Sequence, residues 1–327
     1  MKSFKALLVA SYGRHYLARA IEGESDISPQ ALYQVTSRGK QHLGAVGDIL
    51  EVQETGPEQA VIEKIVERKN LLYRSDAYKS KSIASNVDQI LIVLATEPGF
   101  SPDLLGRAVI AAETAGIIPR IILNKCDLPN KLPAARKMLE PYIAMGYPVH
   151  EMSVKHDPAS VEALLPHVQG RVSVLVGQSG MGKSTLLNAL IPDAAAQTQE
   201  HSKKLDSGKH TTTACRYYDL PASQKNISAN SSAHSSAHSF AGALIDSPGF
   251  QEFGLAHLSE SELQHAFIEF RPLLGKCKFH NCSHGDEPGC VVRAAVDAGT
   301  ISAQRVELFR QLRHESHNAD TIQAKLK

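Results

Sequence analysis

The sequence lacks an excess of charge of either sign. Lysine and arginine total 35, aspartate and glutamate total 34, and the formal net charge is +1 at pH 7. Overall electrostatics therefore do not indicate a nucleic acid as the partner, although a local basic face is compatible with one. The chain also lacks an apolar run near the ~20 residues that cross a bilayer. We expect no membrane-spanning segment.

Cysteine is scarce, with five residues in 327, an odd number. The apolar stretch at residues 6–10 is too short for the core of a signal peptide. An odd cysteine count without a secretion signal argues against a disulfide framework. The sequence therefore favours a reducing, cytoplasmic setting.

Three changes of pattern along the chain predict a multidomain fold. Residues 1–75 alternate short β-type runs with glycine-containing breaks, which predicts a five-stranded, OB-type β-barrel. The runs that the pattern indicates are 5–9, 31–35, 48–52 and 60–66. Continuous apolar runs alternate with helical stretches over 85–255, as in a doubly wound α/β domain. Residues 256–327 combine a Cys/His window with two helical stretches, 259–274 and 302–327, and predict a small helical domain. Residues 222–239 are poor in large apolar groups and predict a disordered insertion.

The strongest local motif follows the apolar run 172–176 and matches G-x-x-x-x-G-K-[ST]. In such a loop, backbone N–H groups cradle phosphates, the lysine neutralises β- and γ-phosphate charge, and the Ser hydroxyl ligates Mg²⁺. The predicted phosphate-binding residues are Gly177, Gln178, Ser179, Gly180, Met181, Gly182, Lys183, Ser184 and Thr185.

A second motif, Asn124-Lys125-Cys126-Asp127, indicates which base is bound. It directly follows a buried apolar run, and its aspartate can accept two hydrogen bonds from guanine, which adenine cannot offer. Ser153, Val154 and Lys155 stand where guanine-nucleotide sites usually have a backbone loop against the base, although this motif is weak alone.

Asp246-Ser247-Pro248-Gly249 fits D-x-x-G, in which the carboxylate holds Mg²⁺ through water and the glycine senses the γ-phosphate. Upstream, three threonines at 211–213 offer a further Mg²⁺ ligand, and we favour Thr212. The order of the motifs is unusual, because the guanine motif precedes the phosphate loop. The α/β domain is therefore predicted to be a circularly permuted GTPase.

Three cysteines and one histidine follow, in the pattern Cys277-x₄-Cys282-x-His284-x₅-Cys290. Closed Cys₃His coordination suits one structural Zn²⁺ that stabilises the C-terminal domain. His280 lies between these residues, and we expect it at the surface or facing RNA instead. His234 and His238 lie in the serine-rich insertion and are more typical of solvated side chains than of a metal site.

This combination resembles the RsgA family, also called YjeQ or EngC: circularly permuted GTPases that act in late maturation of the bacterial small ribosomal subunit. The resemblance spans nearly the whole chain and implies a role on the small subunit and its 16S rRNA. Our hypothesis is that the protein binds the subunit in the GTP state and is released on hydrolysis to GDP, and we expect a monomer. The segments that carry it are 38–40, 46–48, 86–89, 124–127, 177–185, 208–213, 246–250 and the Cys/His cluster.

The residue that orients the attacking water is not the usual one. Ras-like enzymes place Gln directly after D-x-x-G, whereas here Phe250 occupies that position. His210 is the candidate, because an imidazole can polarise water near neutral pH and the resemblance implies this role. The alternative is that His210 only packs or faces solvent.

The barrel is a candidate RNA-binding surface, with basic residues at 38, 40, 68, 69 and 74 as phosphate contacts. A plain solvated basic face is the alternative, since aromatic stacking partners are few. For the whole protein we predict a ribosome-stimulated GTPase. Two alternatives stay open: an RNA-binding assembly factor that uses GTP structurally with negligible turnover, and an ATP-dependent P-loop kinase.

Overall fold

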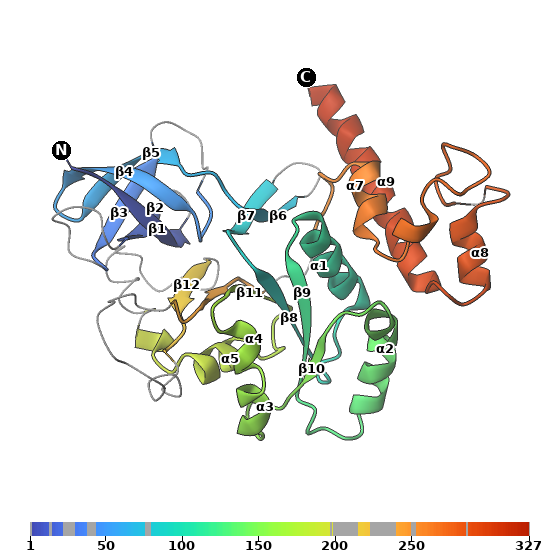
Figure 1. The fold of residues 1–327 in the computed structure, drawn as a ribbon, viewed down its shortest axis with the longest axis horizontal. Helices are drawn as coiled ribbons and strands as arrows, with labels where there is room; N and C mark the ends of the chain where they lie inside the picture. The colour runs from blue at the N-terminus through green and yellow to red at the C-terminus, as the bar shows by residue number, and fades with distance from the viewer. Residues whose placement is uncertain are drawn as a thin grey trace, which may run out of the picture.

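The computed structural model describes residues 2–12, 15–21, 30–37, 44–75, 80–196, 198, 215–222, 240–249, 253–285 and 287–326, with side chains up to 319 except that of residue 80. Three parts follow one another across the molecule: a barrel, an α/β unit and a helical unit (Figure 1). His210, Thr212, Phe250 and most of the 222–239 insertion lie outside the described residues.

The N-terminal part is a closed five-stranded barrel, as the sequence predicts. Its strands are β1 (Ser3–Tyr12), β2 (His15–Ala20), β3 (Leu32–Ser37), β4 (Ile49–Gly56) and β5 (Gln59–Ile65). They pair in the order β1-β2-β3-β5-β4, and β4 pairs back onto β1 to close the barrel. Sequence patterning missed β2, whose residues 16–18 are all buried instead of alternating.

The central part is a sheet in the order β10-β9-β8-β11-β13-β12. Its strands are β8 (Gln89–Ala95), β9 (Ile118–Asn124), β10 (Val149–Glu151), β11 (Val172–Val176), β12 (Arg216–Asp219) and β13 (Ala243–Asp246). All neighbours are parallel except β12, which runs antiparallel to β13. Every residue of β8 is buried, as expected of a strand covered on both faces.

Helices connect the parallel strands, as in other doubly wound sheets. They are α1 (Pro102–Thr114), α2 (Leu132–Ala144), α3 (Pro158–Glu162), α4 (Leu165–Val168) and α5 (Lys183–Leu190). The Ser101 hydroxyl caps α1 by accepting a hydrogen bond from the Leu104 N–H.

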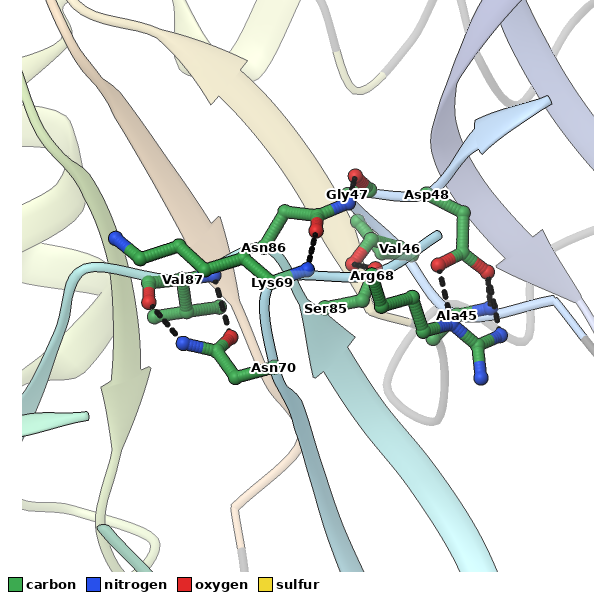
Figure 2. Close-up of polar contacts among 10 residues, drawn as sticks. All are labelled: Ala45, Val46, Gly47, Asp48, Arg68, Lys69, Asn70, Ser85, Asn86 and Val87. Carbon is green, nitrogen blue, oxygen red and sulfur yellow. Dashed lines mark hydrogen bonds and ion pairs between the residues drawn. The ribbon is translucent and has the colours of Figure 1, made fainter. Parts of the chain in front are cut away.

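A polar junction fixes the barrel to the α/β unit, as Figure 2 shows. The Asp48 carboxylate is fully buried and accepts two hydrogen bonds from the Arg68 guanidinium, at 2.7 and 2.8 Å. The Asn86 side chain donates to the Gly47 carbonyl and accepts from the Lys69 N–H, both at 2.8 Å. Arg68 is thus engaged inside the protein, so we remove it from the predicted RNA-facing residues.

Gly47 is required at this junction. Its φ is +99°, and a Cβ there would lie 2.2 Å from the backbone oxygen of Ser85. Only glycine accepts both the left-handed backbone and this close approach. A hairpin of β6 (Leu71–Ser75) and β7 (Ser80–Ser85) continues from the junction toward β8.

The C-terminal part is helical: α7 (Glu260–Ala266), a 3₁₀ turn η2 (Arg271–Leu273), α8 (Val291–Asp297) and α9 (Ala303–Leu326). The predicted single helix over 259–274 is interrupted, because Phe267 and Phe270 turn into an aromatic cluster with Phe309. Helix α1 packs against α7 and α9, which joins this part to the α/β unit. Among the described helices, none is both long enough and apolar enough to cross a bilayer.

Candidate nucleotide-binding site

A cavity of about 590 Å³ opens at the carboxyl edge of the central sheet, where ligands bind in doubly wound folds. The ends of β9, β11 and β13 bring three separate sequence segments to it. The predicted residues that line it are Asn124, Lys125, Asp127, Ser153, Lys155, Ser179, Gly180, Gly182, Lys183, Ser184, Thr185, Asp246 and Gly249. The reversed motif order is thus compatible with a single site.

The loop between β11 and α5 forms the floor of the cavity. The buried ammonium of Lys183 donates to the backbone carbonyls of Gly177 and Gln178, at 2.7 and 2.9 Å. Burial lowers the pKa of Lys183, and the nearby Asp246 carboxylate opposes this shift. Gly177 and Gln178 do not line the cavity; they hold the ammonium that does.

Asn124 connects three segments of the site. Its side-chain amide is buried, donates to the Met181 carbonyl at 3.0 Å, and accepts from the Val154 N–H at 3.2 Å. The adjacent Lys125 ammonium donates to the Gly180 carbonyl at 3.0 Å. Met181 and Val154, both predicted site residues, therefore support the cavity from behind.

Asp127 presents a partly exposed carboxylate at the far end of the cavity. The Ser153 hydroxyl donates to it, and this hydrogen bond lowers the pKa of Asp127. The carboxylate is therefore ionised at neutral pH and keeps acceptor capacity on its solvent side.

Asp246 also lines the cavity and is the last residue of β13. Burial raises its pKa, while Lys183 and Arg216 favour the charged form. Gly249 packs closely on the phosphate loop: a Cβ there would stand 3.3 Å from the Ser179 backbone nitrogen. The D-x-x-G segment and the glycine-rich loop are thus in contact.

Sequence reasoning missed three residues that line the cavity, namely Leu128, His156 and Arg216. Ser247 and Pro248, the two variable positions of the D-x-x-G motif, also line it. Arg216 is the one that adds a buried charge, with a relative exposure of 6%. No motif indicated it, because its place depends on β12 pairing in register with β13. A short strand that pairs with a distant segment leaves no local signal.

The predicted metal residues converge in the helical unit. Ligand atoms of Cys277, Cys282, His284 and Cys290 all lie within 4.8 Å of one another, and His284 Nδ1 is 3.6 Å from the sulfurs of Cys277 and Cys290. A tetrahedral site with Zn–S bonds of about 2.3 Å requires donor separations of roughly 3.8 Å. Burial raises the pKa of Cys282 to about 12, so a cation is needed to keep this thiol deprotonated. His280 is exposed and outside the cluster.

Comparisons with known proteins agree with this architecture. A model of the RsgA GTPase family matches residues 65–256. A protein named small ribosomal subunit biogenesis GTPase RsgA, from Paraburkholderia phytofirmans, is 52% identical over 95% of this chain and 92% of its own length. A protein of the same name from Ralstonia nicotianae is 51% identical, with 95% and 91% covered.

Two solved structures resemble the whole molecule. YjeQ from Thermotoga maritima has a TM-score of 0.67 at 27% identity, covering 96% of this chain and 98% of its own. YloQ, a circularly permuted GTPase, has a TM-score of 0.63 at 26% identity, with 97% and 96% covered. The chain shares its fold with these two structures, and about half of its residues are identical to those of the RsgA relatives. It is therefore a GTP-hydrolysing enzyme that belongs to the RsgA GTPase family.

Proposed function

We propose that this protein hydrolyses GTP in the cavity at the carboxyl edge of its central sheet, and that it does so in the biogenesis of the small ribosomal subunit, as a cytoplasmic monomer. The role in biogenesis is supported by the names of relatives that are about half identical over 95% of the chain.

The observation that carries the proposal is that Asp127 and Lys183 line one cavity although their order in the sequence is reversed. A carboxylate that stays ionised suits the N–H donors of guanine, and a buried ammonium suits phosphate oxygens. The cavity volume of about 590 Å³ is within the usual range for small-ligand sites, roughly 300–1,000 Å³.

Each motif then has a role along the bound nucleotide. Asp127 accepts hydrogen bonds from the guanine base, and the 153–155 backbone contacts the same base. Asn124 and Lys125 hold the phosphate loop and the 153–155 loop in place. The 177–185 loop holds the phosphates through its backbone N–H groups and the α5 N-terminus. Bound Mg²⁺ would neutralise phosphate charge, and Ser184, Thr212 and Asp246 are the residues that offer oxygens to hold it.

Hydrolysis requires a water placed in line with the γ-phosphate. We assign His210 to orient this water, because Phe250 stands where other GTPases have Gln. Without that Gln the protein alone turns over slowly. Docking on the small subunit brings His210 to the attacking water and accelerates hydrolysis, and hydrolysis to GDP then releases the protein.

The barrel and the Cys₃His unit flank the α/β unit and are the proposed contacts with 16S rRNA (Figure 1). The four ligands fit a structural Zn²⁺, since closed coordination leaves no position for a substrate. The domain limits we propose are 1–75 for the barrel, 85–255 for the permuted GTPase and 256–327 for the zinc-binding unit.

Base selection gives a direct test of the site. Asp127→Asn replaces a double acceptor by an amide that matches xanthine, so preference should move from GTP toward XTP. Asp193→Asn is the matched control, because this exposed aspartate lies outside the cavity. Equal GTP binding by both variants, or ATP binding as tight as GTP binding in the wild type, would contradict the assignment.

The cellular role is tested by sedimentation with purified small and large ribosomal subunits. We expect the protein to pellet with small subunits in a non-hydrolysable GTP analogue and much less with GDP, and GTPase activity to rise on adding small subunits. Binding without any release of phosphate, with or without subunits, would favour an assembly factor that uses GTP structurally. His210→Ala should abolish the stimulated rate while leaving nucleotide binding intact.

A further inference from the structure

Strand β12 of the central sheet contacts both the barrel and the nucleotide site. Strand β1 of the barrel pairs antiparallel with β12, where Ala10 lies opposite Arg216, so the barrel and the central sheet form one continuous sheet. The Ser11 N–H donates to the Cys215 carbonyl at 3.4 Å, just before β12 begins. Barrel and α/β unit are therefore joined at a second place, apart from the junction of Figure 2.

An ion pair between Arg19 of the barrel and Asp219 of the central sheet holds β12 to the barrel. The Arg19 guanidinium on β2 donates to both carboxylate oxygens of Asp219, the last residue of β12. The distance from Arg19 Nη2 to Asp219 Oδ1 is 2.9 Å. Arg19 also stands 5.9 Å from the centre of the Tyr217 ring. The Arg19 side chain is 19% exposed and that of Asp219 is 46% exposed. This bidentate contact fixes the orientation of the strand end more than a single hydrogen bond does.

The other end of β12 enters the nucleotide cavity. Arg216 lies directly opposite Asp246 in the β12–β13 register, and residues so paired point to the same side of the sheet. Both residues line the cavity, and Arg216 lies close enough to favour the charged form of Asp246. The barrel thus contacts this four-residue strand at both ends: β1 pairs with it at Arg216, the residue that enters the cavity, and Arg19 holds Asp219 at its other end.

The two attachments of the barrel differ in character. The junction contains the fully buried Asp48 and its bidentate Arg68, together with the Asn86–Gly47 hydrogen bond, and so acts as a stiff support. The β12 contact has one strand pair and a partly exposed ion pair. The junction therefore serves as a pivot, and a rotation of the barrel about it changes the position of β12.

We propose that Arg19 and Asp219 are positioning residues for the GTPase reaction: by clamping β12 to the barrel, they set the position of Arg216 in the nucleotide cavity. The inference rests on the nucleotide site proposed above. It gives that site a physical connection to the barrel, because a ligand that shifts the barrel also shifts Arg216.

The test compares Arg19→Gln and Asp219→Asn in the full-length protein. Each should lower kcat for GTP by about tenfold, as small misplacements in a reacting site do, while KM changes less than about twofold. Arg136→Gln is the control, since Arg136 and Glu151 form another bidentate pair, at 2.7 Å for both bonds, away from the barrel. Because the Asp219 side chain is 46% exposed, solvent screens the pair and its loss should lower the free energy of unfolding by only about 1 kcal/mol. All variants should therefore unfold at similar temperatures.

Two further measurements separate positioning from general loosening. Hydrogen exchange of the β12 peptide should accelerate in Arg19→Gln and stay unchanged in Arg136→Gln. Introduced into the otherwise wild-type protein, Arg19→Gln should lower both kcat and the ratio of GTP affinity to GDP affinity. Introduced into an Arg216→Lys protein, it should lower neither further, because both changes act through residue 216.

Wild-type kcat in Arg19→Gln despite faster exchange in β12 overturns the proposal, and so does an equal loss in both Arg216 backgrounds. Asp127→Asn reports on the nucleotide site separately. A normal switch toward XTP together with an inert Arg19→Gln refutes the clamp alone, whereas an absent switch refutes the site.

Discussion

The phosphate loop depends on one glycine whose replacement can be worked out from the structure. Gly182 has φ +97° and ψ +19°, directly before Lys183. A Cβ at this position would lie 2.2 Å from the side-chain nitrogen of Asn124. That nitrogen cannot swing aside freely, because Asn124 is buried and donates to the Met181 carbonyl. Gly182→Ala must therefore distort the loop or displace Asn124.

Both outcomes have a cost that can be bounded. A non-glycine residue in the left-handed region costs about 1–2 kcal/mol. Displacing Asn124 breaks its hydrogen bonds to Met181 and from Val154, worth about 1 kcal/mol each. The total of about 3–4 kcal/mol corresponds to a loss of affinity of roughly 150- to 900-fold if the loop must regain its shape to bind phosphate.

Titration with a fluorescent GDP analogue, together with urea unfolding, measures both effects. Gly116→Ala is the matched control: Gly116 has φ +66°, and nothing lies within 4 Å of its added Cβ. The control should lose about 1 kcal/mol of unfolding free energy and bind nucleotide normally. If Gly182→Ala binds GDP within about threefold of the wild type, the close contact with Asn124 is not what requires glycine here.

Three further predictions concern other parts of the molecule. Glu269→Ala leaves the buried Arg305 cation unpaired and should destabilise the protein by about 3–5 kcal/mol in urea unfolding, whereas Glu260→Ala, which removes an exposed ion pair between α7 and α9, should change it by less than about 1 kcal/mol. Burial lowers the pKa of His150 from 6.5 to about 4. Between these two pH values the unfolded chain binds a proton that the folded chain does not, so the free energy of unfolding should fall as the pH drops from about 6.5 to about 4. His150→Gln should reduce that fall by about 1–2 kcal/mol, after discounting for the partial exposure of the ring. Cys282→Ser, or a strong chelator, should release one zinc per chain and unfold the helical unit by circular dichroism, and retention of full zinc by the variant would contradict a Cys₃His site.

Much of the architecture could be predicted from local patterns. The phosphate loop, the guanine motif and D-x-x-G each consist of adjacent residues that follow a buried strand, so their chemistry and their place at the sheet edge can be predicted together. The Cys₃His cluster is equally local, and its ligand atoms do converge. The predicted barrel is confirmed by the closed pairing of its five strands. The predicted circular permutation is confirmed by the similarity to a solved circularly permuted GTPase.

What the sequence could not determine depends on contacts between distant segments. Strand β2 was missed because its buried run does not alternate, and the helix predicted over 259–274 is broken by aromatic packing against α9. Arg68 looked like an RNA contact until a buried carboxylate twenty residues earlier was seen to bind it.

The sequence by itself determined the nucleotide motifs, their reversed order and the four residues of the Cys₃His cluster, because short-range spacing encodes each of them. The tertiary structure alone decided that Arg216 enters the cavity and that Arg19 clamps its strand to the barrel. Both depend on the register of β12 between β1 and β13, and strand register is fixed by burial and pairing across the whole sheet rather than by neighbours in the chain.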